Sequence, residues 1–194
     1  MSISGLLWGL AGAVLAFGAA LPVVPADVTA QLPAEYDVLA SVQLSVKGPG
    51  RTFQIIALGR RYEGTAPAPA RPLIIFERRG GRYISLARND HVILRADEGG
   101  QCDPFLDGDA TIAVKGRFFT VENGVACGQH WADYVTFRLD DKAGFVFDNE
   151  RVSSWSINTS NAPDADALVQ SGPARVKRDE PGMLTAFAAW RRGR

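Results

Sequence analysis

The chain has 194 residues, with 21 Lys and Arg against 21 Asp and Glu, so its formal net charge at pH 7 is zero. This balance argues against a nucleic-acid-binding protein, because contacts with phosphates require a surplus of cations. A hydrophobic content of 46% excludes a disordered chain, and two cysteines and two histidines are too few for a cysteine-rich zinc module.

The first 26 residues contain no charged side chain and are mostly apolar. A run of this kind that ends in small residues is typical of a secretory signal peptide, and Val24 and Ala26 fit the −3 and −1 positions of its cleavage site. Cuts after Ala20 or Ala30 are alternatives. An uncleaved anchor is the other interpretation, because about 20 apolar residues span a bilayer. In both cases we expect a periplasmic or secreted protein, which meets a membrane only if the leader is retained.

Short segments of alternating apolar and polar residues, separated by turn signals, follow the leader. This period of two is typical of half-buried strands. The expected strands are Val38–Val46, Thr52–Leu58, Leu73–Glu77, Arg82–Leu86, His91–Arg95, Thr111–Val114, Phe118–Glu122, Tyr134–Leu139, Gly144–Phe147 and Val152–Ile157. Nine or ten strands of this length predict a mainly β fold, either a single antiparallel β-sandwich or a meander.

Two cysteines lie in turn-rich loops on either side of a predicted hairpin. In an oxidising compartment two thiols usually pair, and two buried free thiols are the alternative. We therefore expect a disulfide between Cys102 and Cys127. Closing a loop of this size stabilises the fold by about 3.5 kcal/mol in the chain-entropy model.

The loop around Cys102 is rich in acids, and Asp103, Asp107 and Asp109 are candidate ligands for a cation such as calcium. Their spacing does not match the EF-hand pattern. Asp103 precedes a proline and Asp107 a glycine, which are placements in which the carboxylate usually bonds its own backbone. We therefore expect turns here, and neither a metal nor another cofactor.

His130, next to the expected disulfide, is the better functional candidate of the two histidines, because loops carry sites more often than strands. It belongs to no recognised catalytic motif, and we predict no catalytic residue. Its neighbours Trp131 and Tyr134 are candidate contact residues. With Phe118, Phe119 and Phe137 they form an aromatic cluster that either lines a sugar-stacking groove or packs in the core.

The chain beyond residue 160 has a different composition. Pro163–Gln170 and Met183–Trp190 are predicted to be helical. We therefore expect three parts: the leader over 1–26, a β domain over 27–160 and a short helical, basic tail over 161–194.

The end of this tail supplies a second set of candidate contact residues, Trp190, Arg191 and Arg192. Six Lys and Arg stand against two acids between Ser171 and Arg194. The apolar segment before these cations either packs on the sheet or meets a partner or an anionic surface.

Several motifs between Leu32 and Phe147 resemble a family of small secreted bacterial proteins. They are Leu32–Leu39 (LPAEYDVL), Arg71–Phe76 (RPLIIF), Ala87–Asp90 (ARND), Gly99–Phe105 (GGQCDPF), Phe119–Gly124 (FTVENG) and Tyr134–Arg138 (YVTFR). These proteins look like single-module relatives of FG-GAP/VCBS-type β proteins. The resemblance implies a β fold and export. The first hairpin of such relatives often carries an Asp-rich calcium loop, but Lys47–Phe53 contains no acid here, so the calcium loop is lost.

Export, a disulfide and a β scaffold without a recognised catalytic motif favour a non-catalytic binding module for a protein or glycan partner in the envelope. Two alternatives stay open. A small envelope hydrolase acting on peptidoglycan or polysaccharide could use His130 or a pair of carboxylates. An assembly factor could dock through the C-terminal segment.

Overall fold

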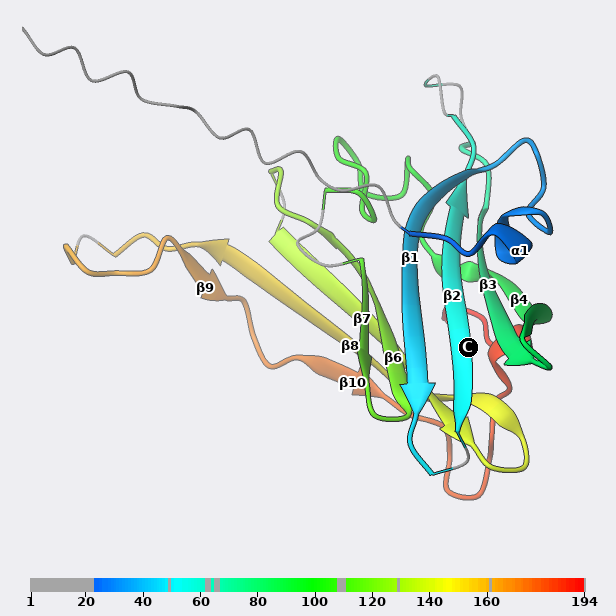
Figure 1. Ribbon diagram of the computed structural model, residues 1–194. Coiled ribbons are helices and arrows are strands. Elements are labelled where there is room, and N and C mark those ends of the chain that lie inside the picture. The colour runs from blue at the N-terminus through cyan, green and yellow to red at the C-terminus, as the bar shows by residue number, and fades with distance from the viewer. Residues whose placement is uncertain are drawn as a thin grey trace, which may run out of the picture.

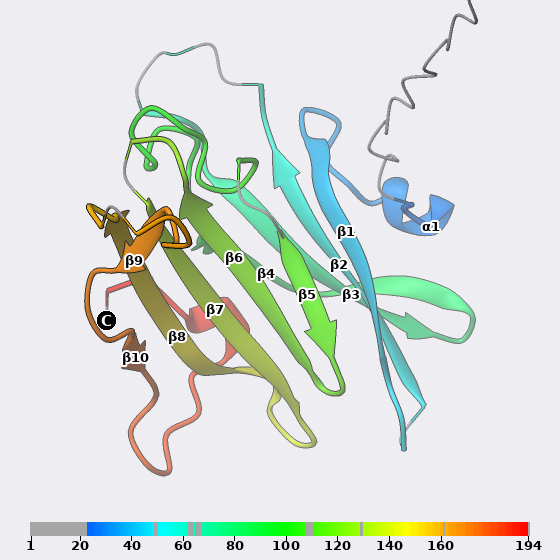
Figure 2. The same ribbon diagram turned by 90° about the vertical axis from the view of Figure 1, so that its left-hand side faces the viewer.

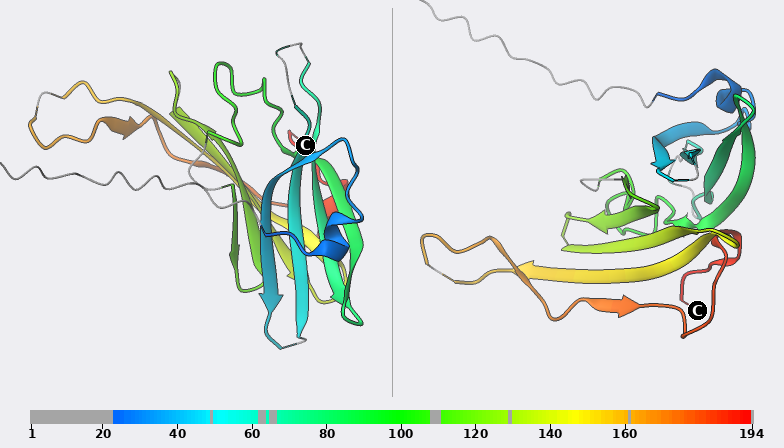
Figure 3. Two further views of the ribbon diagram at one scale, coloured as in Figure 1. Left: turned by 45° about the horizontal axis from the view of Figure 1, so that its top comes forward. Right: turned by 60° about the horizontal axis from the view of Figure 1, so that its bottom comes forward.

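The structure is a computed structural model that describes residues 23–48, 50–61, 64, 67–107, 111–128, 130–160 and 162–193. Within these ranges ten strands form two antiparallel sheets, and helix is limited to α1 (Ala26–Thr29) and the 3-10 turn η1 (Phe187–Ala189). The sheets form the two layers of the molecule (Figures 1 and 3). The prediction of a mainly β, antiparallel, sandwich-like fold is confirmed.

The first sheet is a meander of four strands with both faces covered. Its strands, in spatial order, are β1 (Asp37–Val46), β2 (Arg51–Gly59), β3 (Arg71–Arg79) and β4 (Arg82–Ile93). Ile55 and Ile75 pack toward the second sheet, whereas Ile56 and Ile74 pack on the opposite side with Val28 of α1. Burial on both faces explains why β2 and β3 have uninterrupted apolar runs instead of strict alternation.

The second sheet has six strands and lies beside the first (Figure 2). They are β5 (Ile112–Lys115), β6 (Phe118–Val125), β7 (His130–Asp140), β8 (Gly144–Ile157), β9 (Leu168–Gln170) and β10 (Arg175–Lys177). The order is β10-β8-β7-β6-β5, and β9 also pairs with β8. Figure 1 shows the end of β8 with β9 extending away from the first sheet.

Aromatic side chains fill the space between the sheets. Phe53 of the first sheet meets Phe145 of the second with ring centroids 4.9 Å apart, and Phe137 meets Phe187 at 5.0 Å, both edge to face. Phe119 is also fully buried, whereas Phe118, which precedes it on β6, is exposed. The predicted aromatic cluster is therefore divided by strand alternation, with Phe119 and Phe137 in the core.

Two predicted strand breaks are absent. The expected strands over 82–86 and 91–95 form the single strand β4, and those over 144–147 and 152–157 form β8. The pairing of β4 with β3 and that of β8 with β7 each contain a bulge. A bulge changes the direction of the side chains without ending the strand. The dipeptide Asn123-Gly124, which is typical of turns, lies inside β6 instead. The buried amide of Asn123 accepts from the Leu94 backbone and donates to the Val92 carbonyl, so it links the two sheets.

The tail continues the second sheet and does not form the expected helices. β9, β10 and an isolated bridge from Ala186 to Val146 pair one after another with the edge of β8 that faces away from β7. This edge offers backbone groups over fourteen residues, and pairing with it outweighs the helix propensity of 163–170. Only Phe187–Ala189 of the predicted second helix is helical. Residues 168–170 and 175–177 of the expected tail are therefore strands of the second sheet.

The first described residues cover the outer face of the first sheet. Val28 is fully buried, and the Asp27 carboxylate accepts a hydrogen bond from the Tyr83 amide at 2.6 Å. Residues 1–22 of the predicted leader lie outside the described residues. Among the described helices none is long and apolar enough to cross a membrane.

Candidate functional site

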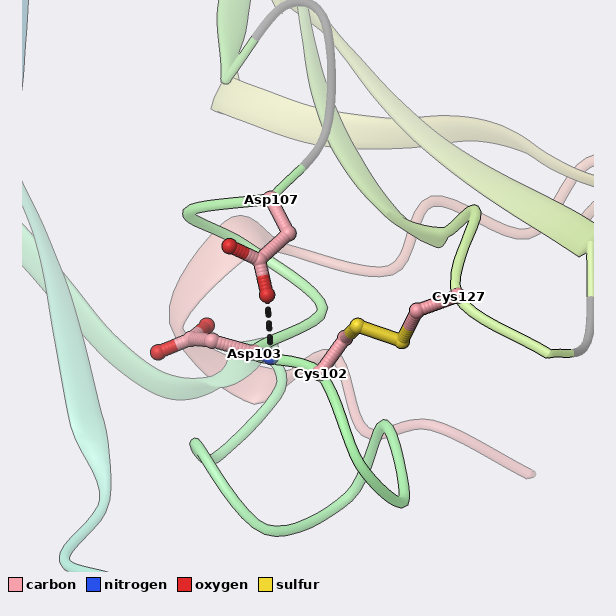
Figure 4. The surroundings of a disulfide bond; sticks show 4 residues. All are labelled: Cys102, Asp103, Asp107 and Cys127. Carbon is pink, nitrogen blue, oxygen red and sulfur yellow. Dashed lines mark hydrogen bonds between the residues drawn. A yellow bond between two sulfur atoms is a disulfide. The ribbon is translucent and has the colours of Figure 1, made fainter.

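The predicted disulfide is present and holds two loops together at one end of the second sheet. Cys102 and Cys127 are bonded, with their Cα atoms 6.2 Å apart (Figure 4). Cys127 lies between the end of β6 and the start of β7. The bond therefore fixes the loop from which β7 begins.

Asp103 and Asp107, in the loop that contains Cys102, accept hydrogen bonds from backbone amides, and Asp103 also pairs with the buried Arg71. Asp103 accepts from the amides of Phe105 and Leu106 and pairs with Arg71, and Asp107 accepts from the Asp103 amide at 2.6 Å (Figure 4). Burial opposes ionisation of Asp103, but the hydrogen bonds and charge of Arg71, with those amides, outweigh it and hold its pKa below the usual range. The expected turn chemistry is confirmed for these two residues.

Asp109, the third candidate cation ligand, lies outside the described residues. In the part of the chain that the structure describes, no three His, Cys, Asp or Glu side chains gather in a way that could hold a metal ion.

A row of small residues crosses the outer face of the second sheet. Gly124 on β6, Ala132 on β7 and Ser153 on β8 are successive cross-strand partners, and their side chains share the face that points away from the core. A Cβ atom on Gly124 would lie 2.8 Å from the Trp131 carbonyl oxygen, so the strands require glycine there.

Larger side chains stand on both sides of this row. The neighbouring row on one side is Glu122, Tyr134 and Arg151, and on the other side His130 pairs with Trp155. The two rows are four residues apart along β7, about 13 Å at the usual rise of a strand. The result is a trough whose base is the small-residue row.

The trough has a volume of about 280 Å³ and also contacts Leu168 of β9. A second depression, of about 420 Å³, lies over the strand ends and is lined by Ser154, Ser156 and Ile157. Three residues line both: His130, Trp131 and Trp155. We name the surface formed by His130, Tyr134 and Trp155 the aromatic trough. All three side chains are partly exposed, so their rings are accessible to a ligand.

The structure thus brings together two of the predicted contact residues, His130 and Tyr134, on the outer face of the sheet. Trp131 points to the opposite face, on the side of Asp133. His130 begins β7 and does not lie in a loop as expected. Sequence reasoning missed Trp155. Its alternation within β8 marked it as a strand residue, but only the register of β7 and β8 places it opposite His130.

The C-terminal candidates do not lie in the trough. Trp190 is buried against Phe137 and Phe147, so it is a core residue and not a contact residue. The Asn89 side-chain amide donates to the carbonyls of Phe187 and Trp190, which fixes this segment against β4.

Arg192 also points inward, where it pairs with Asp133 and Glu150 and donates to the Val92 carbonyl. Burial lowers the pKa of Arg192 to about 10, which leaves it charged at neutral pH. Burial also disfavours the charged form of Glu150, and because Glu150 is an acid this raises its pKa. Arg191 is partly exposed and donates to the carbonyls of Ala188 and Trp190.

Another groove, of about 540 Å³, lies elsewhere, beside the loop that contains Cys102. Its charged lining residues are mostly engaged: Arg71 pairs with Asp103, and Arg60 pairs with Glu35 outside the groove.

Comparison of the chain with protein-family models, with curated proteins and with solved structures gave no match. The resemblance to FG-GAP/VCBS-type proteins stays a prediction.

Proposed function

We propose that this chain is an exported binding module without catalysis of its own, and that the aromatic trough is its contact surface. The observation that carries the proposal is the convergence of partly exposed aromatic rings from β7 and β8 around a base of small residues. Binding sites are typically concave, with aromatic linings and a few polar groups that set orientation.

The compartment is inferred from the disulfide. Disulfides form and persist in oxidising environments and are rare in the cytosol. The bond between Cys102 and Cys127 and the apolar leader together support export to the periplasm or the medium.

The binding proposal is better supported than the hydrolase. A general acid or base must lie within hydrogen-bonding reach of its partner. Two acids line the trough. Glu122 is four residues and one strand away from His130 in the sheet register, which is about 14 Å between backbones, and Asp107 accepts a hydrogen bond from the Asp103 amide. The carboxylate pair Asp133 and Glu150 points between the sheets, where both carboxylates pair with Arg192.

The binding proposal is also better supported than the assembly factor. That alternative required a C-terminal segment that is free to dock. In the structure Phe187 and Trp190 of this segment complete the core.

The test is retention of purified mature protein on the native envelope fraction. Trp155→Ala and Tyr134→Ala remove ring area from the trough, and Phe118→Ala is the matched control, because Phe118 is an exposed aromatic residue of the same sheet outside the trough. Buried aromatic anchors contribute about 2 kcal/mol or more to binding, so we expect at least tenfold weaker retention of the trough variants. Equal retention of all three variants would contradict the proposal, as would turnover of an envelope polymer that His130→Ala abolishes.

A further inference from the structure

We infer that the ligand of the aromatic trough is a glycan chain without net charge that lies across strands β6, β7 and β8. This inference rests on the proposed function and adds the chemical class of the ligand.

The shape of the trough favours a narrow, extended ligand. Its base crosses three strands, which are about 4.8 Å apart, and so extends for about 10 Å. The base carries no side chain larger than that of Ser153. Beyond Tyr134 the next row on the same face is Thr120, Thr136 and Asn149, which is polar. The aromatic strip is therefore limited to one narrow band.

A protein partner of ordinary size requires a wider surface. Stable protein interfaces bury about 800 Å² on each partner around an apolar centre. The polar row of Thr120, Thr136 and Asn149 ends the aromatic surface on one side. A single glycan chain needs only the band itself.

The chemistry of the lining fits sugar rings. Tyr134 and Trp155 offer flat apolar faces, which the C–H face of a pyranose can cover. Around them, Glu122 and His130 supply hydrogen-bond donors and acceptors for ring hydroxyls. Alternation of an apolar face with polar edges is the property that sugar rings share.

The charges beside the trough favour an uncharged glycan. Tyr134 is flanked in its row by Glu122 on β6 and Arg151 on β8, which have opposite signs. The chain as a whole has no net charge to attract a polyanion. A ligand that lies along this row therefore gains nothing from a net charge of either sign.

The test uses the full mature protein and two kinds of probe. The first is the tetramers of N-acetylglucosamine and of β-1,4-linked glucose, with affinity measured by titration calorimetry and by tryptophan fluorescence. The second is the native envelope fraction after protease digestion and lipid extraction, with and without mild periodate, which cleaves the vicinal diols of sugars.

We expect retention on the digested fraction, loss of retention after periodate, and at least a tenfold loss of retention in Trp155→Ala but not in Phe118→Ala. Measurable affinity of the wild type for a tetramer, weakened by the same variant, supports the inference further. Trp155-dependent retention that protease digestion removes would overturn the glycan and leave the binding module standing, with a protein partner. Retention that never depends on Trp155 would overturn both.

Discussion

Trp155 on β8 is the direct cross-strand partner of His130 on β7, and both side chains lie on the outer face of the second sheet. This pairing creates the end of the aromatic trough nearest the disulfide, because Cys127 lies just before His130 in the chain. The predictions below concern the scaffold that holds this pair and then the pair itself.

Asn89→Ala should destabilise the fold although it removes few atoms. The Asn89 amide is the donor to two carbonyls of the C-terminal segment, and the residue is only 2% exposed. An unpaired buried polar group costs about 1–3 kcal/mol, so we expect a loss of about 2–4 kcal/mol in the free energy of unfolding. Urea unfolding measures it, with Asn149→Ala on the outer face as the control. A loss no larger than that of the control would show that Asn89 does not hold the segment.

Removal of the disulfide should lower stability without changing the fold. Cys102 and Cys127 are 25 positions apart, and a cross-link of this span contributes about 3.5 kcal/mol in the chain-entropy model. The variant with serine at both positions should therefore unfold at lower urea concentration while its far-UV circular dichroism stays the same. An unchanged midpoint would contradict this prediction.

The ion pair of Asp103 and Arg71 should make stability fall in acid. The pKa of Asp103 is lowered in the folded state, so the unfolded chain binds more protons and stability rises with pH. The contribution is complete above about pH 4 and is lost as the pH falls through the folded-state pKa.

Asp103→Asn tests this dependence. At pH 7 the variant leaves the buried Arg71 without its counter-charge, which costs about 3 kcal/mol. The difference in unfolding free energy between wild type and variant should shrink between about pH 5 and pH 2. A difference independent of pH would contradict the ion pair.

The mature chain should begin at or before Asp27. Val28 is fully buried beneath the first sheet's outer face, and the Asp27 carboxylate holds the Tyr83 amide. Cleavage after Ala30 would remove both, whereas cleavage after Ala20 or Ala26 keeps them. Intact-mass analysis of protein from the native envelope identifies the site. A mature chain that begins at Gln31 would show that these contacts are dispensable.

The sequence pattern predicts local elements well and their partners poorly. The alternation in Val38–Val46 and Tyr134–Leu139 correctly predicts strands, and the two cysteines correctly predict the disulfide. These signals are local, because they depend on side-chain period and on redox compartment.

The errors concern interactions between residues that are far apart in the chain. Asn123 looks like a turn residue, but its amide pairs with β4 across the two sheets. Trp190 and Arg192 look like part of an exposed basic end. In the structure Asn89 donates to the Trp190 carbonyl, and Arg192 pairs with Asp133 and Glu150 between the sheets. The trough needs the register of three strands, which no local pattern contains, so Trp155 could not be joined to His130 from the sequence.

The central claim is that the aromatic trough is a binding surface, and the most direct measurement compares Trp155→Ala with Phe118→Ala for retention on the native envelope fraction. Both variants remove one aromatic ring from the second sheet, and the trough contains only the first of these rings. We expect retention at least tenfold weaker for Trp155→Ala, with unchanged unfolding midpoints, and wild-type retention for Phe118→Ala. Equal retention of the two variants would contradict the account.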